Sequence, residues 1–308
     1  MKKACAEQKG VKNAMAMDYQ LAWKTRSLLG EGIWWDERRE CLFWVDILKN
    51  ELHCLKDGED RLVKTFADSV GFCAPCTDSR LVVGCGRELL LFDPDSGAAE
   101  VIAHVDDDLP ENRFNDAKCT PDGKLLAGTM NRALDYDEVE DANTGRVYLI
   151  EYGKEPKQLF EGMTVPNGIA FSADGKTVYH TDTYTQKIFA YDYDGAAGTL
   201  TNPRAVVSIP VETGSPDGMN IGADDSLFIA HWGGGALRRF DSATGRELDC
   251  LTLPAKHVTC CCFGGRALDE LYVTTSSIDA PEDEYPLAGS IFVSKCGVRG
   301  RPADRFQV

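Results

Sequence analysis

Four oxygen-bearing side chains lie at nearly the same distance before four apolar, strand-like runs of the chain. Each precedes the first aliphatic residue of its run by 10 or 11 positions, and the four are Glu31, Asn115, Asn167 and Asp217. Carboxylates crowded together repel one another unless a cation lies between them. Donor sets made only of oxygen suit Ca²⁺, Mg²⁺ or Mn²⁺, and Zn²⁺ also accepts carboxylate oxygen. If the fold brings the four together, the sequence predicts a site for one divalent cation.

The elements that must position these residues form a repeat. Six strand-like runs recur 39 to 53 residues apart, with first aliphatic residues Leu42, Leu81, Leu125, Val178, Leu227 and Leu271. Each follows a turn rich in Asp or Gly and precedes a second strand-like run. This period is typical of propeller blades. The sequence therefore predicts one all-β, six-bladed propeller, rather than the two domains that 308 residues suggest or a pair of β-sandwiches.

The segment before each aliphatic anchor is expected to be the innermost strand of its blade. These segments are 29–35, 70–75, 113–119, 166–172, 216–222 and 258–264. Equivalent positions in a radial array converge on the axis, so the four polar residues are expected to face one another at the channel mouth. Long loops at 131–145 and 276–289 are expected to form the rim of this pocket. Trp232, Tyr184, Tyr136 and Phe114 are candidates to line it.

Composition limits the function classes. The chain has 33 Lys and Arg against 49 Asp and Glu, a net charge of −16, which argues against nucleic-acid and anionic-membrane partners. Residues 1–17 carry no apolar signal region and are expected to be a disordered leader or tag, with one propeller domain over 18–308. Without export, the 12 cysteines are expected to be reduced thiols of a cytoplasmic protein.

The same segments resemble a known family. The blocks LGEGIWWDERRECLFWVDI, RFNDAKCTPDGKLLAGTM, VPNGIAFSADGKTVYHTDT and SPDGMNIGADDSLFIAHWGGGALRRFD are similar to the hallmark blocks of the SMP-30/gluconolactonase/regucalcin family. The resemblance extends over about residues 20–300. It implies a six-bladed propeller that binds a divalent cation and hydrolyses sugar lactones to aldonic acids.

The resemblance also implies roles for individual residues. Glu31, Asn167 and Asp217 would bind the metal directly, and Asp217 would also serve as general base. Asn115 would bind substrate or a metal-bound water. Arg113, which the repeat does not single out, would hold substrate oxygens through its guanidinium group.

The sequence departs from the family pattern after AGTM. Lactonases of the family often carry acidic residues there, whereas this chain has Asn131, Arg132 and Ala133. Arg binds carboxylate and phosphate groups bidentately, so Arg132 is a candidate substrate-binding residue. The alternative is an ion pair between Arg132 and the acidic run 135–141.

Three functions are consistent with the sequence. The first is a metal-dependent lactonase acting on a small-molecule lactone. The second is a non-catalytic propeller that binds calcium or another ligand. The third is an ester or phosphotriester hydrolase that uses the same cation.

Overall fold

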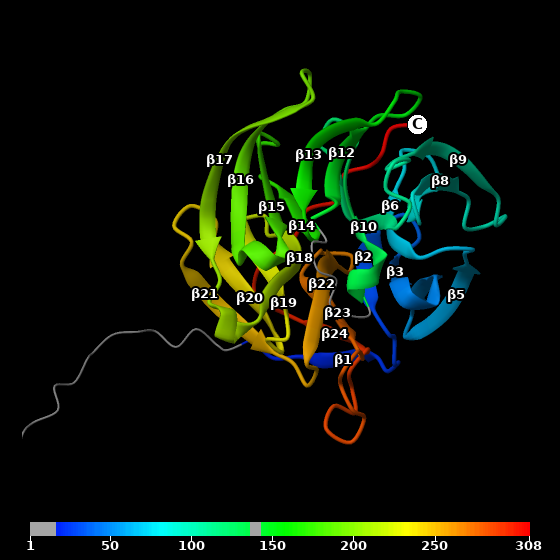
Figure 1. Ribbon diagram of the computed structural model, residues 1–308. Coiled ribbons are helices and arrows are strands. Elements are labelled where there is room, and N and C mark those ends of the chain that lie inside the picture. Colours follow the sequence, from blue (N-terminus) through cyan, green and yellow to red (C-terminus); the bar gives the residue numbers. More distant parts are fainter. Residues whose placement is uncertain (1–16, 136–142) are drawn as a thin grey trace, which may run out of the picture.

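Six four-stranded antiparallel sheets radiate around a central axis and form a β-propeller (Figure 1). The computed structural model describes residues 17–135 and 143–308. The prediction of an all-β, six-bladed propeller is confirmed. Residues 1–16 of the predicted leader lie outside the described residues, whereas Met17 is buried in the apolar core.

The innermost strands coincide with the six predicted segments to within one residue at either end. They are β2 (Gly30–Asp36), β6 (Val70–Pro75), β10 (Asn112–Cys119), β14 (Pro166–Phe171), β18 (Ser215–Ile221) and β22 (His257–Gly264). All of them lie close to the axis because neighbouring blades contact one another through these strands.

The sequence repeat also located the next two strands of each sheet, which carry the apolar runs and the strand after each run. The second strands are β3 (Cys41–Asp46), β7 (Leu81–Cys85), β11 (Leu125–Asn131), β15 (Thr177–Asp182), β19 (Ser226–Trp232) and β23 (Glu270–Ser276). The third strands are β4 (Glu51–Lys56), β8 (Glu88–Phe92), β12 (Gly145–Ile150), β16 (Lys187–Asp194), β20 (Ala236–Asp241) and β24 (Ile291–Ser294).

The outermost strands are largely exposed. They are β5 (Glu59–Thr65), β9 (Ala99–His104), β13 (Lys157–Met163), β17 (Thr199–Ser208), β21 (Glu247–Thr252) and β1 (Gln20–Trp23). Four short 3₁₀ helices complete the described elements: η1 (Ile47–Lys49), η2 (Arg132–Asp135), η3 (Thr183–Thr185) and η4 (Val211–Thr213).

The sixth blade takes strands from both ends of the chain. Strand β1 pairs antiparallel with β24, with Gln20 opposite Val293 and Leu21 opposite Phe292. Figure 1 shows β1 beside β24, next to the first blade. This pairing closes the ring, because the sheet that ends the sequence repeat is completed by the strand that precedes the first repeat.

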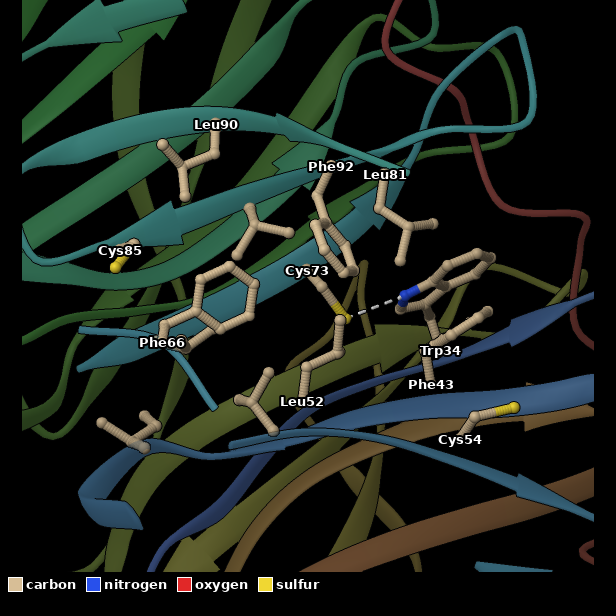
Figure 2. Packing of buried hydrophobic residues seen from close by; sticks show 14 of the residues in the cluster. Trp34, Phe43, Leu52, Cys54, Phe66, Cys73, Leu81, Cys85, Leu90 and Phe92 are labelled. Carbon is tan, nitrogen blue, oxygen red and sulfur yellow. Dashed lines mark hydrogen bonds between the residues drawn. The ribbon is translucent and has the colours of Figure 1, made fainter. Parts of the chain in front are cut away.

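Apolar side chains fill the spaces between adjacent blades. Figure 2 shows the cluster between the first two blades, where Trp34, Phe43, Leu52, Phe66 and Phe92 pack together. The indole nitrogen of Trp34 donates a hydrogen bond to the sulfur of Cys73 at 3.3 Å. Cys73 and the other cysteines of the described residues are free thiols, and most of them are buried in this way.

The C-terminal segment crosses the end of the channel opposite the mouth. The side chain of Arg301 donates to the carbonyl oxygen of Phe171, and the Phe306 N–H donates to that of Pro75 at 2.8 Å. Phe306 is fully buried in the core between the second and third blades. The segment therefore covers this end of the channel, where it lines a cavity of about 180 Å³. Within the described residues, no helix has the length and apolar character to cross a membrane.

Candidate metal and substrate site

Every innermost strand contains a β-bulge near its first residues. In all six sheets the innermost strand has one residue more than its partner strand at this point, as between Glu31 and Trp34 opposite Val45 and Phe43. A bulge bends the strand and re-aims a side chain that would otherwise alternate with its neighbours. The repeated bulge therefore turns the equivalent residue of each blade toward the axis.

Two aspartates, Asp46, which is buried, and Asp182, which is partly buried, fix the entry to two of these strands. Both carboxylate oxygens of Asp46 accept backbone N–H bonds, from Leu28 and Leu29 at 2.9 and 3.1 Å. Asp182 accepts the corresponding bonds from Thr164 and Val165, both at 2.9 Å. These residues lie just before Glu31 and Asn167, so the two aspartates hold the chain where it delivers those side chains to the channel.

The predicted donors meet at the mouth of the channel. Glu31, Arg113, Asn115, Asn167 and Asp217 line one cavity of about 180 Å³. All five side chains are buried, with exposed fractions between 1% and 8%. They come from the first, third, fourth and fifth blades, which confirms that the repeat positions converge.

Hydrogen bonds link the donors to one another. The amide nitrogen of Asn167 donates to Oδ1 of Asp217, which also accepts the Gly218 N–H at 3.0 Å. Arg113 donates through Nη1 to Oδ1 of Asn115 at 2.9 Å. Asn115 in turn donates to the carbonyl oxygen of Pro166 at 3.0 Å. These bonds hold four of the five side chains in place, and the carboxylate of Glu31 accepts the Gly32 N–H at 3.0 Å.

The surroundings of the two carboxylates at the mouth disfavour their ionised forms. Burial, followed by the charges of Asp217 and Asp116, raises the pKa of Glu31 well above its ordinary value, although the Gly32 N–H and Arg113 lower it. Burial and Asp116 also raise the pKa of Asp217 well above its ordinary value. A buried group of carboxylates that cannot all ionise easily is a place where a cation would be strongly favoured.

Sequence reasoning did not single out Asp116. Burial raises its pKa, although Lys118 and the backbone N–H of Ala117, which donates to its carboxylate at 2.8 Å, lower it. The signal was an acid directly after Asn115, but neighbours in a regular strand point to opposite faces. The bulge between Phe114 and Ala117 turns both residues to the channel, where Asn115 lines the cavity at the mouth and Asp116 lines the cavity toward the opposite end.

The other two blades carry no acid or carboxamide at the equivalent position. The registers place Gly71 and Thr259 there. A Cβ atom at Gly71 would lie 2.3 Å from the carbonyl oxygen of Phe114, so no side chain fits. The Thr259 hydroxyl donates to the carbonyl oxygen of Gly30, so it serves the contact between blades.

Of the other residues that the sequence suggested for the pocket, some line the cavity and some do not. Arg132 forms a bidentate ion pair with Asp68 at 3.0 and 3.1 Å and is not among the residues that line the cavity. The acidic run proposed as its alternative partner lies mostly outside the described residues, as does Tyr136. Trp232 and Tyr184 do line the cavity, whereas Phe114 packs edge-on against Phe72 in the core.

The described residues contain no cluster of three His, Cys, Asp or Glu side chains arranged to hold a metal ion. The candidate ligand set is of another kind, since it combines Glu31 and Asp217 with the carboxamide of Asn167. The buried histidines His180, His231 and His257 are not part of it.

The fold and this cavity define a class of protein: a six-bladed propeller with carboxylate and carboxamide donors at one mouth of its channel. The sequence profile of the SMP-30/gluconolactonase/LRE-like region matches residues 29–277. The chain belongs to the SMP-30/gluconolactonase family.

Relatives cover nearly the whole chain. It is 32% identical over 289 residues to the Bacillus subtilis protein named sugar lactone lactonase YvrE, covering 92% of this chain and 97% of that protein. It is 33% identical to human regucalcin over 278 residues, 88% of this chain and 92% of that one. The solved structure of a calcium-binding regucalcin from Agrobacterium tumefaciens superposes with a TM-score of 0.87 at 28% identity, covering 96% of this chain and 100% of that one.

Proposed function

We propose that this chain hydrolyses a lactone to the hydroxy acid with one divalent cation held by Glu31, Asn167 and Asp217. The observation that carries the proposal is the convergence of these side chains, with Arg113 and Asn115, on one cavity at the channel mouth. Membership of a family that contains named lactonases supports the reaction type.

The charges in the cavity fit a divalent cation. When ionised, Glu31 and Asp217 carry two negative charges in this cavity. Asp116 and Lys118 line the cavity toward the opposite end of the channel. A divalent ion would neutralise the two carboxylates, and oxygen donors are the ligands that Ca²⁺, Mg²⁺, Mn²⁺ and, less selectively, Zn²⁺ accept. In this structure Asn167 turns its NH₂ toward Asp217. Rotating that amide by half a turn would present its carbonyl oxygen instead.

Different residues of the chain would bind the substrate and accept the proton during hydrolysis. When bound, the cation would polarise the lactone carbonyl and stabilise the negative charge that develops on it. Arg113 and Asn115 would hold the oxygens of the substrate. Asp217 would accept the proton of the attacking water, and we assign this proton to Oδ2 because Oδ1 accepts the Asn167 and Gly218 bonds. Opening of the ring would release a hydroxy acid.

The test separates catalysis from cation binding. Protein treated with a chelator is expected to lose lactonase activity and to regain it with a divalent ion, measured by pH-stat titration. Asp217→Asn is expected to be inactive but folded, whereas Asp107→Asn on the surface retains activity. Cation binding without turnover of any lactone would instead support a non-catalytic calcium-binding propeller. Faster turnover of aryl esters or phosphotriesters than of lactones would support the third function.

A further inference from the structure

The cavity at the channel mouth has walls of two kinds. Its floor is polar and consists of the side chains already assigned to the cation and the reacting group. Much of the wall above them is apolar, and the apolar lining residues are Leu29, Ile47, Met130, Val165, Trp232 and Ile278. The part of a substrate that extends away from the reacting carbonyl therefore meets carbon surface.

One side of this wall is continuous across three neighbouring blades. Leu29 and Ile47 belong to the first blade and are buried in the apolar cluster between the first two blades. Trp232 of the fifth blade and Ile278 beyond the sixth blade's β23 are partly buried and pack against the same cluster. The apolar surface is thus an extension of the core, which keeps its shape fixed.

The indole ring of Trp232 is held in one orientation by its neighbours. Its ring stacks on that of His257 with centroids 3.9 Å apart and planes 27° apart. Nδ1 of His257 accepts the backbone N–H of Gly233 at 3.1 Å, which fixes the imidazole. Burial lowers the pKa of His257 to about 4, so the stacked ring is neutral at physiological pH. The Trp232 ring therefore presents an uncharged aromatic surface to the cavity.

Two hydroxyls beside the wall already accept hydrogen bonds within the protein. The Ser215 hydroxyl accepts a hydrogen bond from Gln186 at 2.7 Å. Thr183 accepts one from Asn167 at 3.4 Å. Tyr184 also lines the cavity, and it is 66% exposed. A substrate hydroxyl buried against carbon surface, without a partner, loses affinity.

We propose that the pocket selects lactones that carry an apolar substituent, such as an alkyl chain, over polyhydroxylated sugar lactones. The inference rests on the proposed function and deepens it. Trp232 and Ile278 are the specificity-determining residues, because they form the side of the wall that projects from the core.

Three δ-lactones that share the same ring test this preference: δ-valerolactone without a substituent, δ-nonalactone with a butyl chain, and glucono-δ-lactone with hydroxyls. We expect kcat/KM for δ-nonalactone to exceed that for δ-valerolactone by about 10- to 100-fold, which is what burial of a four-carbon chain supplies. We expect glucono-δ-lactone to be the poorest of the three. A preference for glucono-δ-lactone over δ-nonalactone would overturn the inference and leave the proposed function intact. Hydrolysis of none of these lactones would overturn both.

Substitutions in the apolar wall test which residues determine the preference between lactones. Trp232→Ala is expected to lower kcat/KM for δ-nonalactone at least tenfold more than kcat/KM for δ-valerolactone. Ile278→Thr keeps the branched shape, adds a hydroxyl and is expected to shift the same ratio in the same direction, which keeps the test valid if Trp232→Ala folds poorly. Val211→Thr is the matched control, since Val211 is 73% exposed and outside the cavity. An unchanged ratio in both wall variants would refute the role assigned to these residues.

Discussion

Replacing Asp217 by Asn should have opposite effects on stability in the presence and absence of a divalent cation. Without the cation, Asp217 is buried beside Asp116 and Glu31, and its pKa is raised well above the ordinary value. Each unit by which folding raises a carboxyl pKa costs about 1.4 kcal/mol at a pH above both values. Asn keeps an oxygen that can accept the Gly218 N–H and removes the charge. We therefore expect Asp217→Asn to stabilise the cation-free protein at pH 8 by about 1–3 kcal/mol.

With a bound cation, the wild-type chain should instead be more stable than Asp217→Asn. A ligand that binds only the folded state at 1,000 times its dissociation constant adds about 4 kcal/mol. For a domain of this size, 1 kcal/mol corresponds to about 2 °C in Tm, so the wild-type chain should gain about 8 °C. Asp217→Asn, which has lost one of two charged ligands, should gain little.

Differential scanning calorimetry on chelator-treated protein, with and without added Ca²⁺, Mg²⁺, Mn²⁺ or Zn²⁺, measures both effects. The matched control is Glu212→Gln, an exposed substitution that should change neither Tm. The reasoning is refuted if no cation raises the Tm of the wild-type chain. It is also refuted if cation-free Asp217→Asn melts below the wild-type chain at pH 8.

Three further predictions concern the scaffold. Burial lowers the pKa of His231 to about 4, so the unfolded chain takes up a proton between pH 6.5 and 4 that the folded chain does not, and up to about 3 kcal/mol is lost as the pH falls. His231→Asn, whose amide can still donate to the Thr213 carbonyl oxygen, should reduce this loss, as urea unfolding at pH 7.5 and 5 can show. Gly71→Ala should destabilise by about 2 kcal/mol or more in the same assay, because its Cβ would lie 2.3 Å from a backbone oxygen, whereas Gly58→Ala has open space and should cost about 1 kcal/mol. Phe306→Ala should cost about 3–5 kcal/mol and lower the Tm, because it empties a fully buried position, and an unchanged Tm would show that the C-terminal segment contributes no packing energy.

The sequence predicted the blades because their inner three strands follow a regular pattern of turn, apolar run and second strand. The outermost strands gave no such signal, since strands such as β9 and β17 are largely exposed and carry few apolar residues at regular spacing. Strand β1 was missed for a different reason. Its partner in β24 lies some 270 residues away, and no local pattern specifies that pairing.

The site, like the fold, was predicted where it follows from the sequence repeat and missed where it depends on other features. Convergence of Glu31, Asn115, Asn167 and Asp217 followed from their phase in the repeat, because a radial array brings equivalent positions together. The orientation of Asp116 toward the channel required knowledge of the bulge, which breaks the alternation from which strand faces are inferred. The ion pair of Arg132 with Asp68 joins the second and third blades, and the spacing of residues along the chain does not encode such a contact.

Closure of the ring by β1 and β24 has a consequence for the order of events during synthesis. The first five blades are each built from one continuous stretch of chain, so each can form its hairpins as soon as that stretch leaves the ribosome. Residues 20–23 emerge some 270 residues before their partners at 291–293. Strand β1 must therefore wait unpaired while the five intervening blades are made, with its edge open to other chains. A chaperone that shields an exposed edge strand would be most useful to this protein during that interval.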